Sequence, residues 1–377
     1  MLSDFELTEL TQPIIAIYNQ IEMELLEKVA KRFDVYDKIG GSLEWQMKKL
    51  DELGALTNES VKVIAQLSKK GEKEIAQMLK DASIGNIDMD LLDAAFTNGF
   101  IFVDPQKLMQ SETLRATVEL SYKSLGKTYK LIQTKALESA KQAYMDIINR
   151  SYIETASGIY DYNTSIRGAL RDMADQGITG ATYRRGNKLV KYSIEGAVRR
   201  DTITAVHQLA NKGAEQATKE IGAEYVEVSA HIGARVSKDP IANHAGWQGK
   251  VYKLEGSDKY PNLKEKTGYP DDIQGLGGVN CRHRMFPFFP GISVPNPYKV
   301  DPKENKRVYE ATQRQRAMER GIRATKKRLT VAKASGDMEK AKEYRTKLTA
   351  QQKQIEKFCK DNNLRRQTER EMVQEEY

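Results

Sequence analysis

Side chains with metal-ligand or acid–base chemistry are concentrated between Val226 and Ser293. This segment holds three of the four histidines, one of the two cysteines and one of the two tryptophans. Imidazole nitrogens and thiolates are common zinc ligands, and four of them can close a tetrahedral site. The candidate metal ligands are His231, His244, Cys281 and His283.

The spacing of these four residues gives a metal site little support. Zinc ribbons and fingers bring their ligands in close pairs, and here only Cys281 and His283 are close. With one residue between them, we expect both side chains to reach one ion only from an irregular turn. The expectation is therefore no cofactor, with zinc as the open alternative.

A purely structural role accounts for the same residues. Long loops need hydrogen-bond partners for their backbone groups, which His, Asn and Arg side chains supply. On this interpretation four side chains tie the loops to the strands: His231, Arg235, His244 and Arg282. We expect the histidines of this segment, Cys281 and Trp247 to converge in one compact group. The small core beneath is expected to hold Trp247, Met285, Phe286, Phe288 and Phe289. His207, alone on its helix, is expected to be a satisfied core or surface histidine.

The sequence lacks the motifs of several enzyme classes. It has no G-x-x-x-x-G-K-[ST] phosphate-binding loop, no G-x-S-x-G nucleophile elbow and no H-E-x-x-H metalloprotease motif. A metal-dependent nuclease stays as an alternative, with His231 or His244 as the base and the Cys281–His283 pair as ligands. Acidic ligands of obvious placement are missing, and the nearest are Asp271 and Asp272. We therefore predict no catalytic residue.

The composition is that of a chain that buries a core and does not cross a membrane. Of 377 residues, 40% are hydrophobic and 30% are charged, and no apolar run is long enough for a membrane helix. The first residues, MLSDFELTELTQ, are acidic and lack the apolar core of a signal peptide. Two widely separated cysteines form no disulfide framework, which favours a reducing compartment.

The net charge of +8 falls entirely in the C-terminal part of the chain. Residues 301–377 hold 21 basic and 13 acidic side chains, whereas the first 300 residues hold 39 of each. A basic tail can contact the phosphates of double-stranded DNA, or an acidic protein surface, without reading sequence. The alternative is a solvated helix face, because Glu residues are interspersed with the basic ones.

Periodic apolar residues predict a helical domain over residues 1–157. Helices are expected at 12–32, at 42–53 with its end at Gly54, at 58–82 and at 112–157. Apolar residues of the longest helix recur at alternating steps of three and four, which places them on one stripe. The stripe consists of Leu114, Val118, Tyr122, Leu125, Tyr129, Ile132, Ala136, Ala140, Ala143 and Ile147. We expect it to pack against another helix or a partner protein.

Residues 158–295 predict a small α+β domain with short strands and long loops. The expected elements are a helix at 163–176 that ends at Gly177, a hairpin around Arg185-Gly186-Asn187, a helix at 194–221 capped by Ser193, and a strand at Tyr225–Ala230. Small residues such as Gly213 and Ala214 indicate that the helix at 194–221 lies close against a sheet.

Residues 296–377 predict a basic C-terminal helical hairpin. A linker with several prolines, VPNPYKVDP, precedes two helices over 303–361 that are broken at Ser335-Gly336-Asp337. Their apolar stripe is thin, so the hairpin is expected to need the rest of the chain or a partner. The fold class expected for the whole chain is α+β, predominantly α-helical.

Four phrases of the sequence resemble the phage minor capsid proteins of phages and prophages of Gram-positive bacteria, a group similar to the phage Mu F-like head morphogenesis proteins. The phrases are YSIEGAVRRDTITAV, VSAHIGAR, HAGWQGKVY and GLGGVNCRHRMFPFFPGIS, within residues 160–295. The family's motif residues fall on Arg199, Arg200, Asp201, His231, Arg235, His244, Trp247, Gln248, Gly249, Asn280, Cys281, Arg282 and His283. The Mu F-like relatives often end in a second cysteine where this chain has His283, which leaves metal binding open.

The resemblance implies a structural, non-enzymatic role in the virion, inside the phage head, after assembly in the host cytoplasm. Such proteins are associated with the portal and support head assembly and DNA packaging or release. The expected partners are the portal or other capsid proteins, and double-stranded DNA bound non-specifically through the C-terminal basic helices, with no membrane. A metal-dependent nuclease or effector carried in the head is the alternative.

Overall fold

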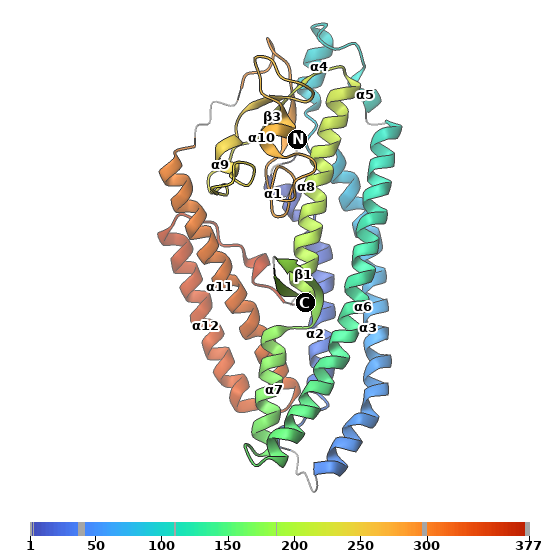
Figure 1. Ribbon diagram of the computed structural model, residues 1–377, viewed down its shortest axis with the longest axis vertical. Coiled ribbons are helices and arrows are strands. Elements are labelled where there is room, and N and C mark those ends of the chain that lie inside the picture. The colour runs from blue at the N-terminus through green and yellow to red at the C-terminus, as the bar shows by residue number, and fades with distance from the viewer. Residues whose placement is uncertain are drawn as a thin grey trace. The chain divides into compact units, whose positions relative to one another are not determined.

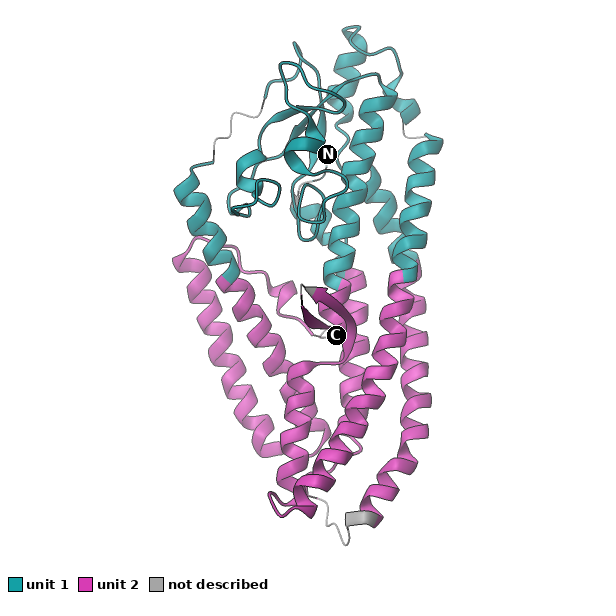
Figure 2. Ribbon diagram, viewed as in Figure 1, with its two compact units in different colours: residues 1–12, 73–127, 199–313 teal, residues 13–72, 128–198, 314–377 magenta. Residues whose placement is uncertain are grey.

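Helices make up most of the chain, in a computed structural model that describes Leu2 and residues 4–36, 42–108, 111–185, 187–295 and 300–373 (Figure 1). The strands are short and form two small sheets, so the predicted, predominantly helical α+β class is confirmed. The chain divides into two units (Figure 2). Unit 1 comprises residues 1–12, 73–127 and 199–313, and unit 2 comprises residues 13–72, 128–198 and 314–377. The sequence predicted three domains that follow one another along the chain, whereas each unit combines three separate segments. The three-domain division stays a prediction.

Four long helices have a turn or more in each unit. They are α3 (Ser42–Ile84), α6 (Glu112–Ala156), α8 (Ile194–Glu220) and α11 (Pro302–Ala334). The predicted stop at Gly54 is wrong, because α3 runs through it without a break. A glycine inside a helix costs only about 1 kcal/mol, and Trp45 and Leu56 on either side of Gly54 are buried. Packing of the flanking turns therefore outweighs the glycine.

The predicted stripe on α6 is buried over most of its length. Within unit 2, Tyr129, Ile132, Ala136, Ala140 and Ile147 are all shielded from solvent. Tyr122, which belongs to unit 1, departs from the prediction and is 39% exposed. The spacing of three and four thus identified the packed face of this helix correctly.

Unit 2 combines helices with one hairpin of strands. Its other elements are α2 (Gln12–Ala30), α7 (Tyr162–Gln176), β1 (Thr179–Arg185), β2 (Lys188–Ser193), α12 (Met338–Asp361) and η1 (Thr368–Arg370). Strands β1 and β2 are antiparallel, as predicted, although Gly186 in their turn lies outside the described residues. The Ser193 hydroxyl accepts the Gly196 N–H at 3.3 Å, which confirms it as the cap of α8.

The C-terminal hairpin forms as expected, with α12 following the end of α11 after Ser335-Gly336-Asp337. Its own core is small and consists of Ile322, Ile355 and Cys359, with Met318, Leu348 and Leu364 packed against them. The hairpin also forms an ion pair with the rest of unit 2. The Lys327 Nζ on α11 lies 2.6 Å from the Glu22 Oε1 on α2. The hairpin thus contacts the rest of unit 2, and its need for those contacts stays a prediction.

Unit 1 contains a three-stranded antiparallel sheet with β3 in the middle. The sheet order is β4 (Val251–Lys253), β3 (Tyr225–Val228) and β5 (Met285–Phe288). Short helices accompany it: α1 (Asp4–Glu9), α4 (Met89–Thr97), α5 (Pro105–Leu108), α9 (His244–Trp247) and α10 (Leu263–Thr267). Strand β3 ends two residues earlier than the predicted Ala230.

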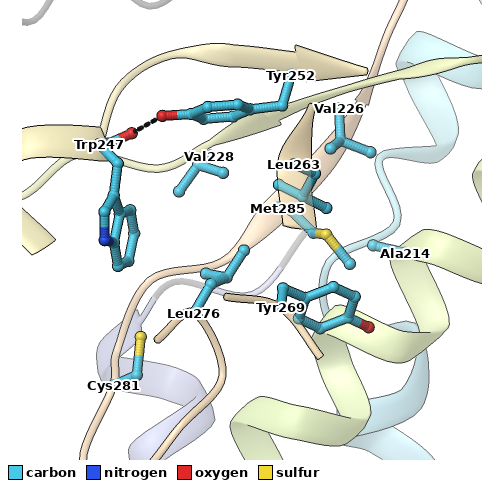
Figure 3. Packing of buried hydrophobic residues seen from close by; sticks show 10 residues of the cluster. All are labelled: Ala214, Val226, Val228, Trp247, Tyr252, Leu263, Tyr269, Leu276, Cys281 and Met285. Atoms are coloured by element: carbon cyan, nitrogen blue, oxygen red, sulfur yellow. Dashed lines mark hydrogen bonds between the residues drawn. The ribbon is translucent and has the colours of Figure 1, made fainter. Parts of the chain in front are cut away.

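The core of the sheet region gathers residues from all three strands, from α8 and from the loops (Figure 3). Its members are Ala214, Val226, Val228, Trp247, Tyr252, Leu263, Tyr269, Leu276, Cys281 and Met285. Trp247 and Met285 were predicted for this core. Phe286 is only half-buried, and Phe288 is buried with its ring centroid 6.0 Å from that of Tyr260. Phe289, just past the end of β5, packs in a second cluster with Ala217 of α8 and with Ile221, which follows α8. The single small core expected from the sequence is therefore divided between two clusters.

Helix α8 uses its small residues for two different contacts. Ala214 packs in the sheet cluster, as expected. A Cβ at Gly213, however, would lie 1.9 Å from the Ser83 carbonyl oxygen on α3. Gly213 therefore permits a close helix–helix approach, which the sequence-based interpretation assigned to a sheet.

Gly213→Ala is expected to lower the free energy of unfolding by about 2–3 kcal/mol, because backbone on the facing helix must move to admit the new methyl group. Gly54→Ala is the matched control, since nothing lies within 4 Å of a Cβ at that position. It should raise the free energy of unfolding by about 1 kcal/mol. Urea titrations of the two variants measure both values, and shifts of the same sign would contradict the close contact at Gly213.

Candidate functional site

Loops of unit 1 bring the predicted site residues together around His283. The ring centroid of His283 lies 4.4 Å from that of His231, 4.8 Å from that of Trp247 and 5.2 Å from that of His244. His244 and Trp247 also contact each other, with centroids 4.6 Å apart. The expected convergence of the histidines and the tryptophan is confirmed, and Cys281 joins them. We call these five residues the histidine cluster.

Cys281 and His283 point to the same side of the segment that leads into β5. Burial alternates along this segment, with residues 281, 283 and 285 buried and residues 282 and 284 half-buried. Such alternation is typical of an extended backbone. The Cys281 Sγ lies 3.7 Å from His283 Nδ1. Residues two apart on such a backbone face the same side, which brings the two side chains together directly after the turn at residues 277–280. Whether they share one ion stays a prediction.

The side chain of Gln248 fixes the orientation of His283. Its Oε1 accepts the His231 backbone N–H at 3.0 Å and lies 2.9 Å from His283 Nε2. Since the backbone N–H can only donate, this atom of Gln248 is the amide oxygen. The Nε2–H of His283 must then donate to it, which leaves a lone pair on His283 Nδ1, the nitrogen that faces Cys281.

His244 is oriented in the same way by a backbone carbonyl. Its Nε2 lies 2.7 Å from the Gln274 oxygen, which can only accept, so Nε2 carries the proton. Arg235 holds the same loop through hydrogen bonds to the carbonyls of Gln274 at 3.2 Å and Val279 at 2.9 Å. Arg235 thus ties its own loop to the loop at residues 274–279, whereas the structural interpretation predicted a tie to the strands, and His244 is left with a lone pair on Nδ1.

Burial keeps both imidazoles neutral. It lowers the pKa of His244 from 6.5 to about 4, against the opposite effect of the hydrogen bond to Gln274. Burial also lowers the pKa of His283 well below its usual value, and the nearby His231 and His244 act in the same direction. Near neutral pH each ring therefore offers one nitrogen lone pair inside the protein.

Two buried asparagines support the cluster and were missed from the sequence. The Asn211 side chain on α8 donates to the His283 carbonyl at 3.1 Å and accepts the Met285 N–H at 2.9 Å. The Asn305 side chain on α11 accepts the N–H groups of Gly233 and Ala234 and donates to the Ala234 carbonyl. A usable signal existed for Asn211, which lies four residues after His207 on the same inward helical face. Asn305 gave no comparable signal.

The other predicted motif residues have local roles. Arg200 and Asp201 form an ion pair with each other on α8, where Arg199 is buried. Gly249 and Asn280 adopt positive φ angles of 67° and 58°, which Gly and Asn tolerate best. Gly249 also donates its N–H to the Val228 carbonyl at 3.0 Å. These two residues therefore shape the loops, and Arg282 is half-buried on the side of the segment opposite Cys281.

The carboxylates considered for a nuclease take part in other contacts. Asp272 accepts the Gln274 N–H in its own turn at 2.8 Å, and Asp271 forms an exposed ion pair with Lys264. Within the described part of the chain, the group of side chains with metal-binding geometry holds two imidazoles and a thiol, without a carboxylate. This composition gives no specific support to the nuclease alternative.

Unit 2 has a cleft lined by several basic residues. Each of them has a carboxylate partner: Arg150 with Glu154 and Asp172, Arg167 with Asp337, Arg171 with Asp172, Arg328 with Asp175, and Lys340 with Glu343. Because these charges are balanced within the cleft, it offers little net attraction to an anion.

Comparison with known families identifies the class of protein. Residues 2–360 match the family described as phage minor capsid protein 2, and the chain belongs to this family. The match extends well beyond residues 160–295, where the motif phrases lie, and includes the N-terminal helices and most of the C-terminal hairpin. The chain is therefore a phage structural protein of the minor capsid type.

Two similar proteins are also named as structural proteins of phages. One, named "Structural protein", comes from Lactococcus phage LL-H and is 25% identical over 345 residues, covering 87% of this chain and 88% of the relative. Another of the same name, from Lactococcus phage mv4, is 30% identical over 116 residues, covering 30% of this chain and 93% of the relative. No solved structure matches the chain. No helix among the described residues is long and apolar enough to span a membrane.

Proposed function

We propose that this phage structural protein works inside the head, next to the portal, and contacts the packaged DNA through one face of α12. Its role is to support head assembly and DNA packaging or release, without catalysis. Membership of the minor capsid family supports the location and the structural role. The distribution of charge on α12 carries the proposal for DNA.

Helix α12 has a mainly basic face beside its buried face. Five exposed cations recur at helical spacing: Lys342, Arg345, Lys353, Lys357 and Lys360. With 3.6 residues per turn, all five fall on one face, which also holds the exposed Glu339 and Glu356. The buried Ala341, Ile355 and Cys359 lie on the neighbouring face. A row of exposed cations along a helix suits the phosphates of a DNA backbone and reads no base sequence.

Other basic side chains of the C-terminal part form ion pairs within unit 2. Five of them pair with carboxylates of the same unit: Arg323 with Glu195, Lys327 with Glu22, Arg328 with Asp175, Arg366 with Glu371, and Arg370 with Glu319. These charges are already neutralised. The proposed DNA contact is therefore narrower than the whole basic tail expected from the sequence.

The triple variant Lys353→Glu, Lys357→Glu, Lys360→Glu is expected to weaken binding to duplex DNA at least tenfold at low salt. The slope of log affinity against log salt should become shallower by about 1 for each phosphate that the variant no longer neutralises. Fluorescence anisotropy with two unrelated duplexes of equal length measures both quantities. The two duplexes should bind equally.

Lys62→Glu, Lys69→Glu, Lys70→Glu is the matched control. It makes the same change of charge at three exposed lysines of α3, also in unit 2. DNA binding should fall much less in this variant than in the α12 variant. Equal losses would show a general effect of net charge and would overturn the assignment to α12, as would unchanged binding of the α12 variant.

Purified phage particles test the location. In full heads the protein is expected to crosslink to DNA under ultraviolet light and to the portal with a short bifunctional reagent. Protease added outside intact particles should leave it uncut. Digestion from the outside, or crosslinks only to tail proteins, would contradict a position inside the head.

A further inference from the structure

We propose that His244, Cys281 and His283 bind one zinc ion, which joins the two long loops of unit 1. The proposal is independent of DNA contact, since it concerns a different unit from α12. One ligand atom from each of the three residues lies within 4.8 Å of the other two. All three residues are buried.

The separation of sulfur and nitrogen matches a tetrahedral site. Zinc bonds of about 2.3 Å to sulfur and about 2.0 Å to nitrogen place the two ligand atoms about 3.6 Å apart at a tetrahedral angle. The Cys281 Sγ and His283 Nδ1 are 3.7 Å apart. A shared ion fits between them without a change in the backbone, and a thiolate with imidazoles is a ligand set that suits zinc.

The hydrogen bonds around both imidazoles have the pattern found at metal sites. Histidine ligands usually donate their second ring N–H to a carboxylate, carbonyl or water, which orients the ring and raises its basicity. Here His283 donates from Nε2 to the Gln248 side chain, and His244 donates from Nε2 to the Gln274 carbonyl. On each ring the nitrogen left for an ion is Nδ1.

His231 is not a ligand in this arrangement, although the sequence placed it in the set. Its ring is stacked on that of His283, with centroids 4.4 Å apart and planes 25° apart. An ion at His283 Nδ1 lies in the plane of that ring, while the lone pairs of a stacked ring lie in a nearly parallel plane beside it. The protein therefore supplies three of the ligands of the zinc ion.

The ion would link segments that are far apart in sequence. His244 begins α9, whereas Cys281 and His283 precede β5, and the chain between them is mostly loop. Because the three ligands converge only in the folded protein, binding energy of the ion adds to the stability of unit 1.

The full-length protein, produced with zinc in the medium, tests the proposal. Elemental analysis after gel filtration is expected to find one zinc ion per chain. Replacement of zinc by cobalt(II) should give the visible bands of tetrahedral cobalt and a thiolate-to-cobalt charge-transfer band in the near ultraviolet. Absence of bound zinc, together with no change in melting temperature on adding zinc, would overturn the proposal.

Variants then identify the ligands. Cys281→Ser should abolish the charge-transfer band, whereas Cys359→Ser, at the other buried cysteine, should keep it. Gln248→Ala leaves all three ligands in place and should weaken zinc binding by about 10–100-fold, which keeps the test valid if Cys281→Ser does not fold. His231→Ala should retain the zinc ion. Loss of the band in Cys359→Ser, or loss of zinc in His231→Ala, would overturn the assigned ligand set.

Discussion

Glu22→Ala is expected to lower the free energy of unfolding by about 3–5 kcal/mol, because it leaves a buried ammonium group without its counter-charge. The Glu22 carboxylate is 1% exposed and the Lys327 side chain that pairs with it is 10% exposed. The same carboxylate accepts the backbone N–H groups of Ile178 at 3.2 Å and Glu195 at 3.1 Å. One side chain on α2 thus satisfies the start of β1, the start of α8 and a cation on α11.

Urea denaturation followed by circular dichroism measures this loss. Glu22→Gln should fall between the wild type and Glu22→Ala, since it keeps an acceptor oxygen but loses the charge. Glu138→Ala removes an exposed ion pair with Lys135 and should change the free energy of unfolding by less than about 1 kcal/mol. A loss in Glu22→Ala no larger than in Glu138→Ala would contradict the role of Glu22 as a buried junction.

Asn211→Leu is expected to lower the free energy of unfolding by about 3–5 kcal/mol, because each buried polar group left unsatisfied costs about 1–3 kcal/mol. Leucine has a similar volume, so the loss reports hydrogen bonds more than packing. The groups affected are the His283 carbonyl, the Met285 N–H and the Asn86 side-chain amide. Zinc affinity should also fall, since Asn211 positions the segment that carries His283.

Asn86→Leu provides the comparison for this prediction. It removes only the contact from Asn86 to Asn211, at 3.1 Å, and leaves the two hydrogen bonds to residues 283–285 in place. Its loss of stability should be clearly smaller, and the double variant should lose less than the sum of the single losses. Equal losses for the two single variants would show that Asn211 does not position the segment before β5.

Local sequence signals were sufficient for most helices and for the members of the histidine cluster. The apolar spacing in residues 112–157 gave the packed face of α6, and Ser193 and Gly177 marked helix ends. The predicted convergence of His231, His244, Trp247 and His283 needed only the concentration of these rare residue types in one segment with few regular elements. These features depend on residues close in sequence, where propensity and periodicity are informative.

Features that depend on distant partners were not predictable from the sequence. The small neighbours of Gly213 indicated a close contact there, but not that the contact is with the backbone of another helix. The geometry of Cys281 and His283 required knowing that their backbone is extended. The spacing from His207 could place Asn211 on the inward face of its helix but could not give its partners. The partners of Asn211, Asn305 and Glu22 lie at least 71 positions away.

Helix α11 has a consequence for synthesis of the protein on the ribosome. It supplies Asn305 to the loop at Gly233 and Lys327 to Glu22, and the latter pair is separated by 305 positions in the chain. Helix α2 of the nascent polypeptide therefore emerges long before Lys327, which pairs with the Glu22 carboxylate, has been translated. A product cut short by a nonsense codon before residue 302 would lack partners in both units at once, which makes it a substrate for host proteases.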